Sequence, residues 1–224
     1  MIPWTLLGTA TIPGDGGEMR LYQRGTEFSI RVGGYELMNS RAHGSEDALA
    51  ELVCKEIGGR GRVLIGGLGM AFTLNAMLQC VTAGSEVIVA ELVPEVVEWH
   101  RGPLRVISGT ALDDPRVRVE TADVAAVIRA GQYDAIVLDV DNGPAGLTSK
   151  NNDWLYGTEG LKVIQAALHP GGVLAVWSSG PDAAFTRRLH RVGFQSEEVI
   201  VRSSGGKGPR YLIWVARRPP AARS

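Results

Sequence analysis

The chain has 224 residues, a formal net charge of −1 and 45% hydrophobic residues. This length suits one α/β domain with a small addition, or two modest domains, and the apolar fraction is enough for a sizeable core. The sequence has neither the basic stripe of a nucleic-acid binder nor a run of about 20 apolar residues that would span a membrane, so we expect neither partner.

The two cysteines and the N-terminal residues bear on the cellular compartment. Cys54 and Cys80 fit neither a Cys-x-x-Cys pair nor a zinc spacing, and both fall in apolar helical patterns. This predicts buried free thiols. The first residues lack the basic region of a secretory signal peptide. We therefore expect a cytoplasmic protein.

The first 44 residues predict a small β region. Four short runs with β-like patterns are separated by glycines, at 5–11, 19–24, 27–32 and 35–38. A helix is expected next, over 45–57, with Ser45 as its N-cap and Gly58 and Gly59 as its end. The domain prediction is accordingly a β region at 1–44 and a catalytic domain at 45–224.

From residue 62 onward, apolar strands alternate with helices. Strands are expected at 63–65, 86–90, 117–119, 135–138 and 173–177, and helices at 70–80, 94–106, 123–129, 158–168 and 182–192. This alternation predicts a mostly parallel sheet covered on both faces. The last two strands, at 196–201 and 211–216, have only a short turn between them and must pair antiparallel.

A glycine-rich turn and an acidic residue predict a nucleoside site. Gly66, Gly67 and Gly69 follow the first of these strands and precede a helix, where glycine allows a tight turn close to a ligand. Glu91 ends the next strand, where a carboxylate can accept hydrogen bonds from two ribose hydroxyls. Phe72 occupies the place of the third glycine of a dinucleotide motif, which disfavours an NAD-binding oxidoreductase.

Further acidic residues follow the third and fourth strands of the alternating part. Asp123 is expected either to accept from an adenine amine or only to cap the following helix. Asp139 and Asp141 precede a Gly-Pro-Ala sequence at the crevice where open α/β sheets bind ligands. Two adjacent acids are costly without a cation, so we expect an ammonium, a sulfonium or a metal ion there, and an Asp-Asn-Gly turn is the structural alternative.

At these positions the chain resembles the spermidine synthase family, over roughly residues 19–216. The resemblance lies in the β region, the glycine turn, Glu91, Asp123 and the loop that begins at Asp139. It implies a class I methyltransferase (Rossmann-like) fold, with a seven-stranded sheet that ends in an antiparallel hairpin. It also implies that Asp139 accepts the proton. The chain differs from the family at Asn142, at Val93 and at 44–48, where the family has a Tyr-His-Glu segment.

The resemblance and the patterns together define the expected site. The catalytic residues are Asp139 and Asp141, the substrate-binding residues are Asp141, Trp154 and Tyr156, and the cofactor-binding residues are Gly66, Gly67, Leu68, Gly69, Glu91, Leu92, Asp123, Val124 and Asp139. Trp154 and Tyr156 are expected either to wall the acceptor pocket or to be ordinary core. The turn at 203–209, which contains Lys207, is either a flap over the site or an exposed turn.

The first functional hypothesis is a transferase that uses S-adenosylmethionine, without a metal, on a small amine-bearing acceptor. The second is an aminopropyltransferase that uses decarboxylated S-adenosylmethionine. The third is a protein that binds an adenosyl ligand without catalysis. The sequence leaves the acceptor open, and also whether two copies pair through the N-terminal strands.

Overall fold

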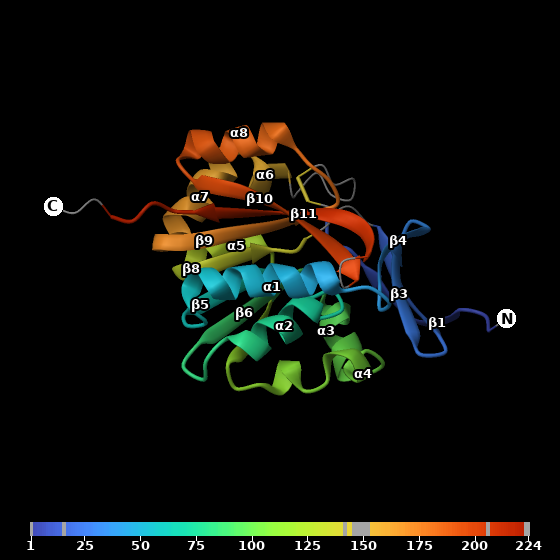
Figure 1. Cartoon of the computed structure of the whole chain (residues 1–224). Coiled ribbons are helices and arrows are strands. Elements are labelled where there is room, and N and C mark those ends of the chain that lie inside the picture. The colour runs from blue at the N-terminus through green and yellow to red at the C-terminus, as the bar shows by residue number, and fades with distance from the viewer. Residues whose placement is uncertain (1, 15–16, 141–142, 145–152, 205–206, 222–224) are drawn as a thin grey trace.

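The computed structural model describes residues 2–14, 17–140, 143–144, 153–204 and 207–221. Its N-terminal part is a four-stranded antiparallel sheet in which the strands follow chain order (Figure 1). These strands are β1 (Thr5–Thr11), β2 (Glu18–Arg24), β3 (Glu27–Val32) and β4 (Tyr35–Asn39). They match the predicted runs to within one residue at each end. Whether this region and the remainder are separate domains stays a prediction.

The rest of the chain forms a seven-stranded sheet in the order β10-β11-β9-β8-β5-β6-β7. β5 to β9 run parallel, and β11 pairs antiparallel with both β9 and β10. The predicted fold class is therefore confirmed. The strands are β5 (Arg62–Gly66), β6 (Glu86–Glu91), β7 (Val117–Thr121), β8 (Tyr133–Leu138), β9 (Leu168–Ser178), β10 (Gln195–Ser204) and β11 (Lys207–Arg217).

Helices cover both faces of this sheet (Figure 1). One face packs on α1 (Gly44–Ile57), α2 (Phe72–Cys80) and α3 (Pro94–Arg101), and the other on α5 (Val124–Ala130), α6 (Asp153–Tyr156), α7 (Thr158–Ala167) and α8 (Ala183–Val192). Successive strand residues alternate between the two cores, because side chains of a strand point to opposite faces. Within β5, for example, Val63 and Ile65 pack on the first core and Leu64 on the second. Two short helical segments, α4 (Arg105–Ser108) and η1 (Ala111–Asp113), connect α3 to β7.

The N-terminal sheet shares its core with the first face of the larger sheet. Leu21, Phe28 and Ile30 are almost fully buried in the same apolar cluster as α1, α2 and α3. β1 lies against α3, since a Cβ placed on Gly8 would be 2.6 Å from Nε1 of Trp99. The sheet is thereby held at the carboxyl ends of the parallel strands, where the site forms.

Three predicted element boundaries are wrong. α1 begins at Gly44, so Ser45 lies inside the helix and His43 is the N-cap residue, without a side-chain capping bond. The expected helix at 94–106 is two helices, because Gly102 and Pro103 interrupt it. Pro170–Gly172 does not separate a helix from a strand, because β9 already starts at Leu168 and absorbs the irregularity as a register shift against β8.

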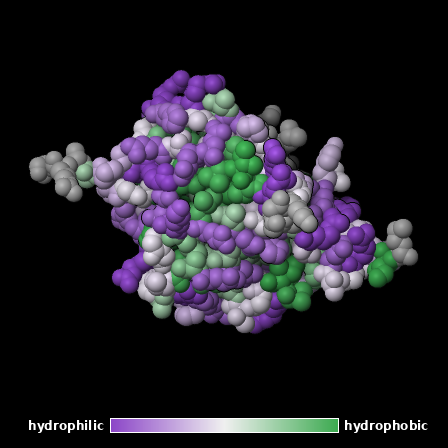
Figure 2. Space-filling model, in the orientation of Figure 1, coloured by the Kyte–Doolittle hydropathy of each residue, from purple (hydrophilic) through white to green (hydrophobic). Residues whose placement is uncertain are grey.

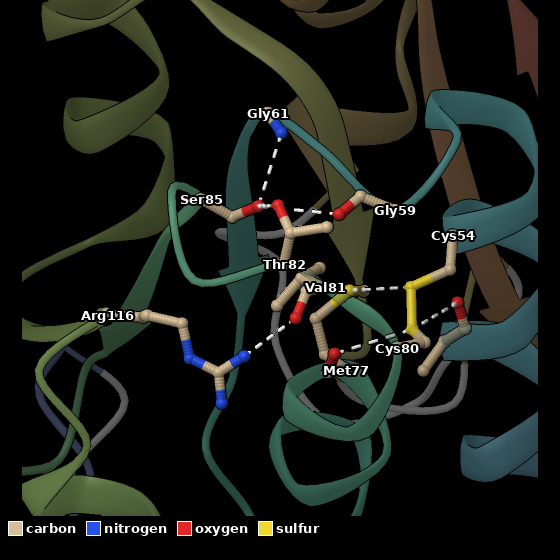
Figure 3. Close-up of a disulfide and its surroundings, with 10 residues drawn as sticks. Cys54, Gly59, Gly61, Met77, Cys80, Val81, Thr82, Ser85 and Arg116 are labelled. Carbon is tan, nitrogen blue, oxygen red and sulfur yellow. Dashed lines mark hydrogen bonds between the residues drawn. A yellow bond between two sulfur atoms is a disulfide. The ribbon is translucent and has the colours of Figure 1, made fainter.

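The prediction of free thiols is also wrong, because Cys54 and Cys80 form a disulfide (Figure 3). The bond joins the last part of α1 to the last residue of α2, and Sγ of Cys54 lies 3.5 Å from Sδ of Met77. The sequence pattern placed both cysteines in helices but could not show that the two helices pack side by side. The expected cytoplasmic location, which drew on free thiols, stays a prediction.

The molecular surface is mostly polar on the face drawn in Figure 2, with an apolar patch toward the β10 side of the sheet. Ile200, on the edge strand β10, is 65% exposed. Among the described residues, no helix is long and apolar enough to cross a membrane. Pairing of two copies through the N-terminal strands stays a prediction.

Candidate functional site

A cavity of about 730 Å³ lies between the two sheets. Its wall includes residues at or just beyond the carboxyl ends of β5, β6, β7 and β8, and residues of the N-terminal sheet face it from the other side. An open α/β sheet binds ligands at this edge. The predicted residues Gly67, Gly69, Glu91 and Asp139 border this one cavity, together with Leu92, Asp123 and Val124.

The glycine turn brings the backbone against two neighbours that leave no room for a side chain. Gly67 has φ of 89°, and a Cβ there would lie 2.7 Å from the carbonyl oxygen of Asp139. Gly69 has φ of 51°, and a Cβ there would lie 2.7 Å from the terminal methyl carbon of Met38. Gly67 therefore requires glycine for backbone conformation and for space, whereas at Gly69 the positive φ favours glycine and the methionine side chain could move. Gly66 and Leu68 complete the turn but do not border the cavity.

Glu91 ends β6 and is 7% exposed. Its two carboxylate oxygens accept hydrogen bonds from the backbone N–H groups of Leu68, at 2.9 Å, and Val93, at 2.8 Å. Burial raises the pKa of Glu91, and these backbone donors oppose that shift. The side chain thus ties the glycine turn to the end of β6, and each oxygen keeps a lone pair that a ribose hydroxyl can use.

Asp123 caps α5, since its Oδ1 accepts from the backbone N–H of Ala125 at 2.7 Å. The same side chain borders the cavity, so the capping role does not exclude contact with a ligand. Leu92 and Val124 border the cavity beside it, Leu92 41% exposed and Val124 buried. The predicted adenine contact of Asp123 stays a prediction.

Asp139 follows β8 and has an unusual environment for a carboxylate. Oγ1 of Thr73, a buried residue of α2, donates to its Oδ2 at 2.6 Å. Burial is the main cause that raises the pKa of Asp139 to about 7, the negative charge of Glu46 adds to the rise, and the hydrogen bond from Thr73 opposes it. A carboxylate with a pKa near neutrality can exchange a proton during catalysis.

Glu46 is a site residue that the sequence analysis missed. It lies in the first turn of α1, is half-buried on the cavity wall, and accepts from Oγ of Ser45 at 2.5 Å. Burial is the main cause that raises its pKa. Its position within the segment compared with Tyr-His-Glu was the available signal. The sequence pattern around Glu46 could not predict that it would act on Asp139, because the two residues lie 93 positions apart in the chain.

The remaining predicted residues divide into two groups. Asp141 lies outside the described residues. Trp154 and Tyr156 are not among the described residues that line the cavity. Tyr156 is buried in the second core and Trp154 packs at its edge under the guanidinium of Arg129, so their described contacts favour the core interpretation.

The ends of β9 and β11 supply an aromatic pair that was not predicted. Trp177 and Tyr211 line the cavity with ring centroids 4.9 Å apart. β10 and β11 occupy most of the predicted turn at 203–209, since β10 runs to Ser204 and β11 starts at Lys207, and Ser203 lines the cavity. Residues 205 and 206 and the side chain of Lys207 lie outside the description, so the role of this turn stays a prediction.

Comparison with known proteins finds distant sequence relatives that share one name, polyamine aminopropyltransferase. No protein-family model matches the chain. It is 34% identical over 102 residues to a polyamine aminopropyltransferase of Mycobacterium tuberculosis H37Rv, covering 43% of this chain and 18% of that protein. It is 31% identical over 128 residues to polyamine aminopropyltransferase 1 of Streptomyces coelicolor A3(2), covering 55% of this chain and 23% of that protein. The chain thus spans less than a quarter of the length of these relatives.

Solved structures match over nearly the whole chain. Spermidine synthase from Thermotoga maritima superposes with a TM-score of 0.76 at 19% identity, covering 95% of this chain and 72% of that one. A spermidine synthase in complex with the transition-state analogue AdoDATO superposes with a TM-score of 0.77 at 18% identity. The match covers 95% of this chain and 73% of that one. At these identities the likeness establishes the fold.

Proposed function

Because the chain has the spermidine synthase-like fold, we propose that it transfers an aminopropyl group from decarboxylated S-adenosylmethionine to a small amine. The names of its sequence relatives, polyamine aminopropyltransferases, support this over methyl transfer, which was the first hypothesis from sequence. The proposal concerns this chain alone, since the matched stretch is a minor part of those longer proteins.

The observation that carries the proposal is the charge of the cavity. Among its described lining residues are the carboxylates of Glu36, Glu46, Glu91, Asp123 and Asp139, and no Lys, Arg or His. The carboxylate of S-adenosylmethionine would enter this wall without a basic partner, which costs free energy through desolvation and like-charge repulsion. The decarboxylated compound lacks that group and keeps two positive charges, so the described wall suits it better.

The residues of the wall fit such a compound. Gly67 and Gly69 bring backbone to the cavity wall, Glu91 is positioned to accept from the ribose hydroxyls, and Asp123 borders the same space. When bound, the sulfonium supplies an activated carbon: the amine forms the C–N bond, the C–S bond breaks with its electron pair left on sulfur as 5′-methylthioadenosine, and the amine proton leaves to a base.

Asp139 is the proposed base. It is ionised above a pH of about 7, the range in which more of the acceptor amine is in its neutral, nucleophilic form. Thr73 holds one oxygen of the carboxylate, which leaves the other for the amine proton. After the transfer, the proton passes from Asp139 to solvent. Glu46, beside it, provides the second negative charge for an ammonium group.

Calorimetry tests the ligand. We expect decarboxylated S-adenosylmethionine to bind at least about tenfold more tightly than S-adenosylmethionine, because only the latter brings a carboxylate to the acidic wall. 5′-Methylthioadenosine, which has neither tail charge, controls for the nucleoside part. A Glu46→Gln variant should narrow the difference between the two sulfonium compounds and leave the affinity for methylthioadenosine unchanged. Equal or tighter binding of S-adenosylmethionine by the unaltered chain would contradict the proposal.

A further inference from the structure

All five carboxylates in the described cavity wall accept hydrogen bonds, but three of them are held by backbone N–H groups or lie near a guanidinium. Glu91 accepts from two backbone N–H groups and Asp123 caps α5. Glu36 accepts from Oγ of Ser29 and from Nδ2 of Asn39, both at 2.8 Å, and Nη2 of Arg41 lies 3.5 Å from it. The charge of Glu36 is therefore balanced within the protein. Within the described wall, Asp139 and Glu46 each accept from a single side-chain hydroxyl, that of Thr73 or Ser45, and are the acids best placed to take cationic groups.

Aminopropyl transfer uses both of these acids. The aminopropyl group that is transferred carries its own ammonium, which needs one negative charge. The attacking amine needs Asp139 to accept its proton. A diamine acceptor would bring a second ammonium at its far end. Placing that ammonium against a wall without a free carboxylate costs the free energy of removing it from water.

Among its described residues that line the cavity, the N-terminal sheet brings one acid, Glu36, whose carboxylate is already engaged by Ser29, Asn39 and Arg41. Its side chains on the cavity include Met19 paired with Val32 across β2 and β3, and Ile30 paired with Met38 across β3 and β4. Directly opposed residues lie on the same face, so these four form a continuous apolar surface. Met38 reaches the glycine turn, where its methyl group lies next to Gly69. The apolar surface thus extends to the edge of the nucleoside space.

From this arrangement we propose that the acceptor is a primary monoamine whose body is apolar, an alkyl or aryl chain, and not an α,ω-diamine. Its amino end meets Asp139, and its apolar body lies on the surface formed by Met19, Ile30, Val32 and Met38. The inference rests on the proposed aminopropyl transfer and defines its substrate class. Burial of apolar area supplies the binding energy that a second charge supplies for a diamine.

A matched pair of acceptors tests the proposal. 1-Aminohexane and 1,5-diaminopentane have the same length, and differ in whether the far end is a methyl or an ammonium group. With decarboxylated S-adenosylmethionine in excess, release of methylthioadenosine gives kcat/KM for each at one pH. We expect 1-aminohexane to exceed the diamine by at least about tenfold, and each methylene from butyl to hexyl to add about fourfold.

The outcomes distinguish failure of the proposed acceptor class from failure of the proposed aminopropyl transfer. A kcat/KM for 1,5-diaminopentane equal to or above that for 1-aminohexane overturns the acceptor class and leaves aminopropyl transfer intact. If no amine of either kind releases methylthioadenosine from protein that still binds methylthioadenosine, the transfer itself is refuted, and the acceptor class with it.

Variants of Val32 test the apolar surface directly. Val32 is half-buried at the end of β3, just before the turn at Gly33, so its side chain is only partly enclosed by the protein. Val32→Glu should raise the diamine-to-monoamine ratio of kcat/KM at least about tenfold, whereas the uncharged Val32→Gln should not. Met38→Glu and Met38→Gln repeat the comparison if a Val32 variant fails to fold. Equal ratios in the Glu and Gln variants contradict the placement of the acceptor.

Discussion

Asp139 is held in a setting that opposes its own ionisation. Burial and the nearby Glu46 raise its pKa to about 7 from an ordinary value of 3.8. The folded chain therefore binds a proton more strongly than the unfolded chain between about pH 4 and pH 7. In that window the contribution of this group to stability falls as the pH rises, and above pH 7 the protein retains an ionised group that destabilises it.

Asp139→Asn should therefore stabilise the fold at pH 8 by about 2 kcal/mol, because the amide carries no charge to desolvate. Most of the gain should disappear near pH 4, where the folded chain holds Asp139 protonated and the unfolded chain is close to its midpoint of protonation. Urea unfolding at the two pH values measures it. The same variant should lose turnover by at least about 100-fold if Asp139 is the base. A gain of equal size at both pH values would assign the effect to shape and not to charge.

Thr73 is a positioning residue for that carboxylate, through its 2.6 Å hydrogen bond. Thr73→Val keeps the shape and removes the donor, so the pKa of Asp139 should rise further. The acidic limb of the pH profile of kcat/KM should then move to higher pH by about half a unit or more. Thr73→Ser, which restores the hydroxyl, should return it. An unmoved limb in the valine variant would show that Asp139 does not set it.

At the scale of elements, α1 and α2 both meet the site with their first turns. Their first turns carry Glu46 and Thr73, which bear on Asp139, and their last parts are joined by the disulfide between Cys54 and Cys80 (Figure 3). The covalent link thus fixes the two helices at the ends remote from the cavity. Packing of these two helices brings the hydroxyl of Thr73 and the carboxylates of Glu46 and Asp139 together.

Replacing both cysteines with alanine should lower stability by about 3 kcal/mol, because the bond closes a loop with a sequence separation of 26 and restricts the unfolded chain. Thermal unfolding of the two proteins under oxidising conditions measures the loss. A reductant should lower the midpoint of the unaltered chain toward that of the variant and leave the variant unchanged. If reductant has no effect on the unaltered chain, the bond does not form in solution.

At the scale of the whole molecule, the cavity exists because two sheets meet. The seven-stranded sheet supplies the glycine turn and the acids at its strand ends, and the four-stranded sheet supplies the apolar wall (Figure 1). Their shared core, which includes Leu21, Phe28 and Ile30, holds the wall in place. Ligand preference in this chain is thus a property of the junction, and neither sheet alone contains it.

The sequence predicted the order of strands and helices well, because apolar periodicity, glycines and capping residues act within a few positions. It also predicted that Gly67, Glu91, Asp123 and Asp139 would share one edge, since the ends of successive parallel strands meet there. Where it was wrong, at the break at 170–172 and the start of α1, the pairing of distant strands or the packing of a helix outweighed local preference.

Local pattern by itself therefore determined the fold class and the gathering of Gly67, Glu91, Asp123 and Asp139 at one cavity. Tertiary structure decided the rest: the approach of Glu46 and Thr73 to Asp139, the bond between Cys54 and Cys80, and the apolar surface opposite the acids. These depend on contacts between segments tens of residues apart. Such contacts arise when helices and sheets pack, and periodicity along the chain does not encode them.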